Sequence, residues 1–164
     1  MWGLGLLVLA LIFTAMPPAQ ASVHTYRERP GQVTLRSQQS LRDATDQAWQ
    51  AVVFKRWQQG QVQGTYLRLV GFPGVVAMDR ARPLAVLATT GQQWSLPPRL
   101  DPQTTALPDN AAQYALAPLL ADLYQPLPLD LQVFLLDREP ITLTLAPFVV
   151  REWLQLKRSA IATP

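Results

Sequence analysis

The side chains in this chain that could do catalytic chemistry are few. There is one histidine, His24, and no cysteine. The lack of thiols excludes cysteine catalysis, thiolate zinc sites and iron–sulfur clusters. We do not expect a Ser–His–Asp triad on His24, because a general base needs a fixed partner and this residue lies at the mobile start of the predicted domain. We therefore predict no catalytic residues, no metal site and no cofactor.

Paired carboxylates are the remaining candidates for acid–base chemistry. Asp43 and Asp46 fall in a predicted turn, where such residues usually bond to the backbone. Glu139 and Glu152 have no spacing that would bring them together. The Gly-containing stretch 71–74 lacks the Lys-Ser/Thr ending and the helix of a phosphate loop. A hydrolase-type enzyme is therefore only our third hypothesis.

The basic residues suggest binding instead. Twelve of the fourteen are Arg, and residues 1–82 hold nine Lys or Arg against four Asp or Glu, whereas the rest holds five against seven. Arg binds planar anions through two hydrogen bonds and packs on aromatic rings. Tyr66 and Arg68 on one predicted strand face, with Arg36 and Arg42 on a neighbouring strand, form our predicted partner-binding surface. The alternative is a scattered, solvated set of charges.

This charge pattern restricts the kind of partner. We expect an acidic protein, and we also consider peripheral contact with an anionic membrane surface. We do not expect nucleic acid, because no cluster of five to eight Lys or Arg and no recognised nucleic-acid-binding motif is present.

The first 21 residues predict export. An apolar run ends at Pro17-Pro18, and Ala19-Gln20-Ala21 follows as a small-x-small cleavage site. The uninterrupted part of the run is shorter than the roughly 20 residues of a membrane-spanning helix. We expect a signal peptide over 1–21, cleavage between Ala21 and Ser22, and a single globular domain over 22–164. The alternative is a buried N-terminal helix.

Frequent prolines favour short strands over long helices. The segment 48–57 is ambiguous: Trp49, Val52, Val53 and Trp57 form a helical stripe, but its β-branched and aromatic content favours a strand, which we choose. Residues 97–110 are expected to form an irregular loop. Strands are predicted at 33–42, 48–57, 65–70, 75–78, 84–88, 93–96, 129–136 and 141–145, and helices at 118–124 and 147–158.

The last helix should bury one stripe and expose the other residues. Val149, Val150, Trp153 and Leu154 are its predicted packing residues, whereas Arg151, Glu152, Gln155 and Arg158 should face water. Together these elements predict an α+β, β-dominated domain: a mainly antiparallel sheet or small barrel with two short helices.

Four segments, 40–43, 49–56, 67–74 and 147–153, resemble a family of cyanobacterial exported proteins, the domain of unknown function 3122. The resemblance extends from about Tyr26 to Trp153. It implies a photosynthetic bacterium, in which export leads to the periplasm or the thylakoid lumen, and it implies no activity or site residue. The chain departs from the family pattern at Asp46, where we expect glycine.

Our leading hypothesis is an exported, non-catalytic accessory or binding protein, associated with a membrane protein complex of the thylakoid lumen or periplasm. The alternative is a carrier of a small molecule or lipid with a β-barrel interior. A carrier should copurify with its ligand, whereas a binding protein should crosslink to one or a few proteins.

The export hypothesis predicts a mature chain that starts at Ser22. Intact-mass measurement on the protein isolated from the cells that make it should give the mass of residues 22–164. A mass that retains residues 1–21 would show that the segment is not a cleaved leader.

Overall fold

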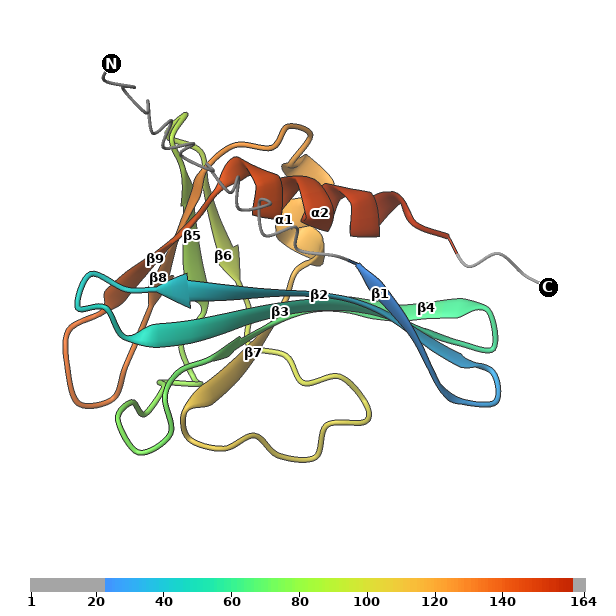
Figure 1. Ribbon diagram of the computed structural model, residues 1–164, viewed down its shortest axis with the longest axis horizontal. Helices are drawn as coiled ribbons and strands as arrows, with labels where there is room; N and C mark the ends of the chain where they lie inside the picture. The colour runs from blue at the N-terminus through green and yellow to red at the C-terminus, as the bar shows by residue number, and fades with distance from the viewer. Residues whose placement is uncertain (1–22, 161–164) are drawn as a thin grey trace, which may run out of the picture.

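The computed structural model describes residues 23–160, which form two antiparallel sheets and two helices (Figure 1). The five-stranded sheet has the order β1-β2-β3-β4-β7, and the four-stranded sheet has the order β6-β5-β8-β9. The strands of the five-stranded sheet are β1 (His24–Arg29), β2 (Gln32–Arg42), β3 (Ala48–Gln58), β4 (Gln61–Val70) and β7 (Ala111–Ala115). Those of the four-stranded sheet are β5 (Leu84–Ala88), β6 (Gln93–Leu96), β8 (Leu129–Val133) and β9 (Ile141–Leu145).

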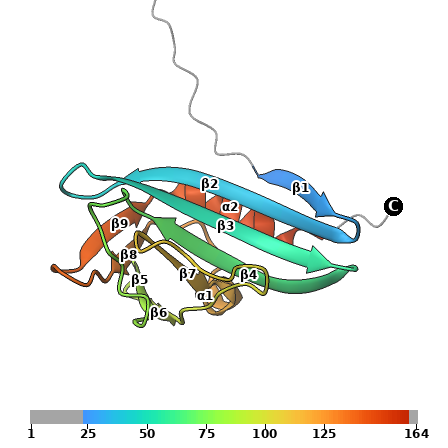
Figure 2. The ribbon, with the colours of Figure 1, turned by 90° about the horizontal axis from the view of Figure 1, so that it is seen from below.

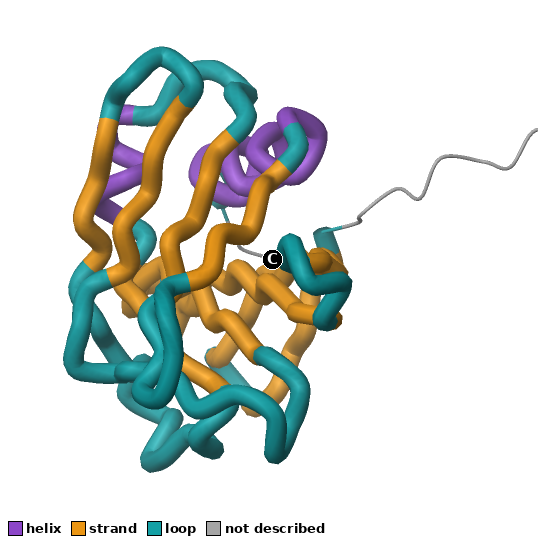
Figure 3. Tube along the Cα trace, turned by 90° about the vertical axis from the view of Figure 1, so that its left-hand side faces the viewer, coloured by secondary structure: helices purple, strands orange, loops and turns teal. Residues whose placement is uncertain are grey.

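The two sheets share one core, and their strands run at a steep angle to each other (Figures 1 and 3). Alternation decides which side chains enter this core, because successive residues of a strand point to opposite faces. On β3 and β4, the odd-numbered Trp49, Ala51, Val53, Leu67 and Leu69 are buried in it. The sheets do not close into a barrel, so of the two predicted β architectures the antiparallel sheet is the one observed.

The strand assignment of 48–57 is confirmed, because β3 pairs with β2 and with β4 along its length. Its hydrophobic residues could be read as a helical stripe because both faces of this strand are apolar. Trp49 and Val53 belong to the core, and Trp57 is buried near the end of the strand, while Val52 and Phe54 are buried on the opposite face.

Helix α2 (Pro147–Arg158) packs against β2 and β3, and the short helix α1 (Ala117–Asp122) packs against β4, β6 and α2. Proline stands in the first turn of each helix, where its missing N–H costs no hydrogen bond. At the end of α2, Lys55 Nζ donates to the carbonyls of Lys157 and Ser159 at 3.0 and 2.8 Å. No helix in the described part of the chain is long and apolar enough to cross a membrane.

One predicted strand is not observed, and two observed strands were not predicted. Residues 75–78 do not form a strand but a turn followed by one bridge between Met78 and Leu135. Strand β7 was not predicted because its sequence, rich in alanine, has little β propensity, and it is held by pairing with β4. His24, which we expected in an irregular terminus, begins the edge strand β1. The predicted signal peptide and its cleavage site at Ala21 and Ser22 lie outside the described residues.

The hairpin between β2 and β3 explains how the chain accommodates Asp46 at the position where we expected the glycine of the family pattern. Its backbone has a φ of 64°. This left-handed conformation is the one that favours glycine and that aspartate tolerates better than most residues. The turn is held by Asp43, whose carboxylate accepts hydrogen bonds from Thr45, Gln47 and the indole of Trp49.

The prediction that Glu152 faces water is wrong. Its side chain is buried between α2 and β2, and Ser37 Oγ donates a hydrogen bond of 2.7 Å to Glu152 Oε2. The helical stripe is wider than predicted because β2 extends over the full length of α2. Burial raises the pKa of Glu152, and the weaker effect of the Ser37 hydrogen bond opposes this rise.

The raised pKa of Glu152 predicts a pH-dependent stability. Because the folded state binds this proton more tightly than the unfolded state, stability should fall as pH rises from the ordinary value of about 4.3 through the raised pKa. Glu152→Gln should remove this fall, measured as urea midpoint against pH. Glu139→Gln, at an exposed loop position, is the control and should keep the wild-type profile. Identical profiles for wild type and Glu152→Gln would contradict the assignment.

Candidate functional site

The face of the five-stranded sheet that points away from the core carries the candidate site. We call it the outer face: the even-numbered side chains of β2, β3 and β4, with Gln113 of β7. The register places Arg36, Phe54 and Tyr66 in one row across three strands, and Arg56 beside Thr34 in the next row. Figure 2 shows this side of the sheet with β2, β3 and β4 in front of α2.

An open pocket of about 270 Å³ lies on the outer face. Its lining contains Arg36, Arg56 and Arg68, from three successive strands, and no carboxylate. The Phe54 ring lies between them, with the guanidinium carbons of Arg56 and Arg68 at 5.5 and 5.4 Å from its centroid. Such contacts between cations and an aromatic ring hold the guanidinium groups in place without neutralising them. We call this site the arginine pocket.

The loop 97–110 crosses the outer face and brings one carboxylate to the arginines (Figure 2). Arg56 Nη1 donates to Asp101 Oδ1 at 2.5 Å, and Arg68 Nη2 lies 3.7 Å from Asp101 Oδ2. Within the loop, Thr104 Oγ1 and the Gln103 N–H also donate to this carboxylate. The Asp101 side chain is fully buried, so this loop is fixed to the sheet by a shielded ion pair.

Gln113 strengthens the attachment of the loop. Its side-chain oxygen accepts hydrogen bonds from Arg68 Nε and Nη2 at 3.0 and 2.7 Å, while its Nε2 donates to the Arg99 carbonyl at 3.1 Å. Farther along the loop, Gln32 Nε2 donates to Gln103 Oε1 at 2.8 Å. The loop is therefore tied to β2, β3, β4 and β7.

The charges of the site shift the pKa values of both partners. Burial alone would raise the pKa of Asp101, but hydrogen bonds from Thr104 and Gln103 and the charge of Arg56 outweigh it and hold this pKa below its usual range. Burial also lowers the pKa of Arg68, as do the charges of Arg36 and Arg56, while Asp101 opposes them. The three guanidinium groups therefore repel one another, and one carboxylate does not balance them.

Among the described residues, three buried polar atoms of the pocket lining have no hydrogen-bond partner: Thr34 Oγ1, Arg36 Nε and Arg56 Nε. Thr34 is only 3% exposed. A buried polar group without a partner costs about 1–3 kcal/mol, so such groups are uncommon in native proteins. All three atoms belong to residues that line one pocket, beneath its accessible surface.

A glycine shapes the aromatic floor next to the pocket. Tyr66 stacks on Phe54 with ring centroids 5.4 Å apart, and its ring lies over Gly64. A Cβ atom at Gly64 would lie 2.6 Å from the Tyr66 hydroxyl oxygen. Only glycine therefore leaves room for Tyr66 in this position.

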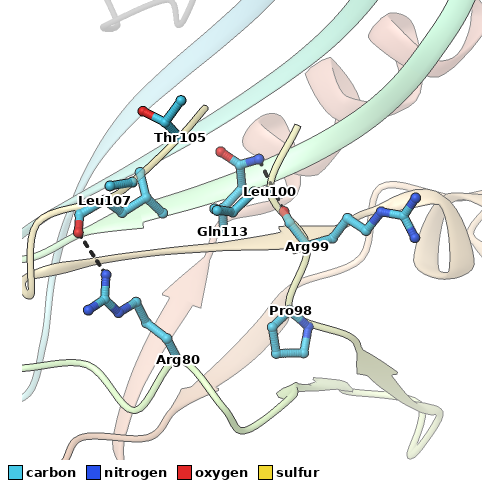
Figure 4. A pocket seen from close by; sticks show the side chains of 8 residues that line it. Arg80, Pro98, Arg99, Leu100, Thr105, Leu107 and Gln113 are labelled. Carbon is cyan, nitrogen blue, oxygen red and sulfur yellow. Dashed lines mark hydrogen bonds between the residues drawn. The ribbon is translucent and has the colours of Figure 1, made fainter. Parts of the chain in front are cut away.

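A larger cavity, of about 410 Å³, lies on the other side of the loop (Figure 4). Arg80 and Arg99 line it, but their side chains point in different directions, and Arg80 is bound to the Leu107 carbonyl and to Asp109. The rest of its lining is mostly apolar and comes from the loop itself. The arginine pocket is the stronger candidate because its polar atoms converge and lack partners.

The four predicted partner-binding residues all have side chains on the outer face, but they do not form one cluster. β2 and β4 are not neighbours, because β3 lies between them. Arg36 and Arg68 line the pocket, while Tyr66 lies beneath it against Phe54. Arg42 lies at the hairpin end, where its guanidinium donates to the Asp46 carbonyl at 2.8 Å and is 3.4 Å from the Asp46 carboxylate.

Arg56, Asp101 and Thr34 were not predicted as site residues. Arg56 and Phe54 share the even-numbered alternation of β3 with Val52, which was the available signal. Asp101 lies in a loop without periodicity, so no sequence pattern indicated its contacts.

The carboxylate pairs considered for catalysis are not brought together as acid and base. Asp43 stabilises its hairpin, Asp46 is paired with Arg42, and Glu152 is buried against Ser37 while Glu139 lies in an exposed loop. In residues 23–160, no group of three or more His, Asp or Glu side chains is arranged to hold a metal ion.

Comparison with known proteins gives a family without an activity. Residues 21–156 match the model of a family described as "Protein of unknown function (DUF3122)". No curated protein and no solved structure matches the chain. The match agrees with the resemblance found in the sequence motifs, and the function must be argued from the geometry of the site.

Because Asp101 pairs with two arginines, we expect its substitution to affect both the stability of the whole domain and the mobility of the loop 97–110. Asp101→Asn should lower the free energy of unfolding by about 3 kcal/mol, because two shielded guanidinium groups lose their carboxylate. Hydrogen exchange should also accelerate in the loop 97–110. Asp109→Asn is the matched control in the same loop: its side chain is 85% exposed, so we expect about 0.5 kcal/mol or less. Equal effects of the two substitutions would contradict the role of Asp101.

Proposed function

We propose that this chain, which belongs to the family of proteins of unknown function DUF3122, is an exported, non-catalytic binding protein. Its outer face receives an acidic segment of a protein partner. The observation that carries this proposal is the arginine pocket, in which three guanidinium groups from adjacent strands face one carboxylate of the chain itself.

Charge and shape together favour a protein partner over a membrane surface. The arginines are recessed: the side chains of Arg56 and Arg68 are only 11% and 31% exposed. Binding to a flat anionic membrane depends on protruding basic side chains and inserted apolar groups. An acidic side chain, in contrast, can enter a pocket and accept hydrogen bonds from Arg in a defined geometry.

The carrier hypothesis has less support. It required a barrel interior, and the space between the two sheets is filled by buried side chains such as Leu67, Val86, Leu131 and Leu143. The enzyme hypothesis also has little support, because the candidate carboxylates are not brought together as acid and base. A binding role needs neither a barrel interior nor a pair of catalytic carboxylates. It would use the outer face, where polar groups have no partner among the described residues.

The proposal includes the cellular compartment in which the protein works. Removal of residues 1–21 would leave a domain without cysteine, so the fold outside the cytoplasm would rest on its core alone. We propose that the protein works in the periplasm or the thylakoid lumen, next to a membrane protein complex that presents an acidic segment.

Site-specific photo-crosslinking tests this proposal in the cells that make the protein. A crosslinkable residue at Gln38, exposed on the outer face beside Arg36, should repeatedly give the same few proteins. The crosslinked peptides, identified by mass spectrometry, should be rich in Asp and Glu. A second probe at Leu87, exposed on the four-stranded sheet, is the matched control and should not give these peptides.

Two outcomes would overturn the proposal. Recovery of the same proteins from both positions would show that the outer face is not the binding surface. Crosslinks from Gln38 to lipid rather than to acidic peptides would favour the membrane alternative.

A further inference from the structure

The arginine pocket has two halves with different electrostatic balance. On the side of β4, Arg68 and Arg56 share the carboxylate of Asp101. On the side of β2, Arg36 lacks an acidic partner among the residues that the structure describes, and its Nη2 donates only to the side-chain oxygen of Gln38 at 2.9 Å. The positive charge that Asp101 does not neutralise is therefore concentrated near Arg36.

Two of the unpartnered atoms belong to this half, on β2, and the third belongs to Arg56 of β3, at the border between the two halves. The register sets Thr34 directly opposite Arg56 on the neighbouring strand, and Arg36 follows Thr34 on the same face of β2. Thr34 Oγ1, Arg36 Nε and Arg56 Nε are the buried side-chain atoms that have no partner within residues 23–160. A hydroxyl and two guanidinium N–H groups can all donate hydrogen bonds, so the missing partner is an acceptor.

We infer that this half of the pocket, between Thr34, Arg36 and Arg56, is a binding site for a carboxylate group. This inference rests on the proposed function and names the chemical group of the acidic partner that the pocket holds. The bound carboxylate would be the counterpart of Asp101, so that two carboxylates would face three guanidinium groups.

Asp101 supports the choice of a carboxylate. The adjacent half of the pocket already binds one through Arg56, Thr104 and the Gln103 N–H. Arg56 thus has one of its terminal nitrogens on Asp101 and its Nε still unpartnered. Guanidinium groups match the planar, two-oxygen geometry of carboxylates, and such charge-assisted bonds are stronger than neutral ones.

The three unpartnered atoms are themselves buried, so a ligand would reach them through movement of the side chains that cover them. Gln38 is exposed, and its turning away would release Arg36 Nη2 for a ligand. The pocket is open to solvent, with enough volume for a carboxylate and the first carbons attached to it. Phe54 forms an apolar wall for these carbons, which gives the site a preference for an organic acid over a bare inorganic anion.

An NMR titration of the purified chain tests the site. The probes are a tripeptide of three glutamates with blocked termini, its glutamine analogue, and acetate, while the signals are the arginine Nε–H groups. The glutamate peptide should shift the signals of Arg36 and Arg56 in a saturable way, and the glutamine peptide should not. Arg36→Gln should weaken the binding by about tenfold, the loss of one charge-assisted hydrogen bond.

Arg42→Gln is the matched control, because Arg42 is on the same strand and face but is bound to Asp46. It should change the affinity less than twofold. Circular dichroism and thermal unfolding should show that both variants fold. Equal weakening by the two variants, or equal binding of the glutamine peptide, would overturn the inference.

The outcomes also distinguish a failure of the carboxylate site from a failure of the proposed function. Acetate that binds as tightly as the peptide would assign the site to small free carboxylates. In that case, the absence of crosslinks from Gln38 would overturn the protein partner but not the carboxylate site. Acidic crosslinks that persist in Arg36→Gln, together with no saturable shift, would overturn the carboxylate site and leave the protein partner in place.

Discussion

The buried carboxylate of Asp101 is the interaction on which the functional face of this protein depends. It fixes a long loop to the sheet, and it partly neutralises two guanidinium groups that would otherwise repel each other. Burying a charge is costly unless it is paired and hydrogen-bonded, and here Arg56, Thr104 and Gln103 supply those bonds. Among the described residues Arg36 has no acidic counterpart, so the surface that this contact orders stays positively charged.

The rest of the fold makes this arrangement possible because the five-stranded sheet buries one face in the core and presents the other face outside it. Odd-numbered residues of β3 and β4 enter the shared core, which leaves the even-numbered residues free to carry arginines. A second small apolar cluster, Val52, Phe54 and Tyr66, then supports the guanidinium groups from below. The core holds the strands in register, and the register determines which guanidinium groups meet.

Much of this could be predicted from the sequence, because alternation and proline positions are local signals. The strand at β3 followed from its β-branched and aromatic content, the final helix from its helical pattern, and the common face of Arg36 and Arg68 from period-two alternation. β7 could not be found this way, since it forms only by pairing with β4. The role of Asp101 was also hidden, because it depends on contacts with residues more than 30 positions away. Glu152 was misplaced since a helical pattern does not show how far a neighbouring strand extends over the helix.

The central claim is that an ionised Asp101, held by two arginines, organises the candidate site. Carboxyl-carbon NMR of the intact chain across acidic pH measures this directly. The account predicts that the Asp101 signal titrates below the ordinary aspartate value of about 3.9, and that the Nε–H signals of Arg56 and Arg68 move in the same pH range. An Asp101 signal that titrates at or above the ordinary value, without any response from these arginines, would contradict it.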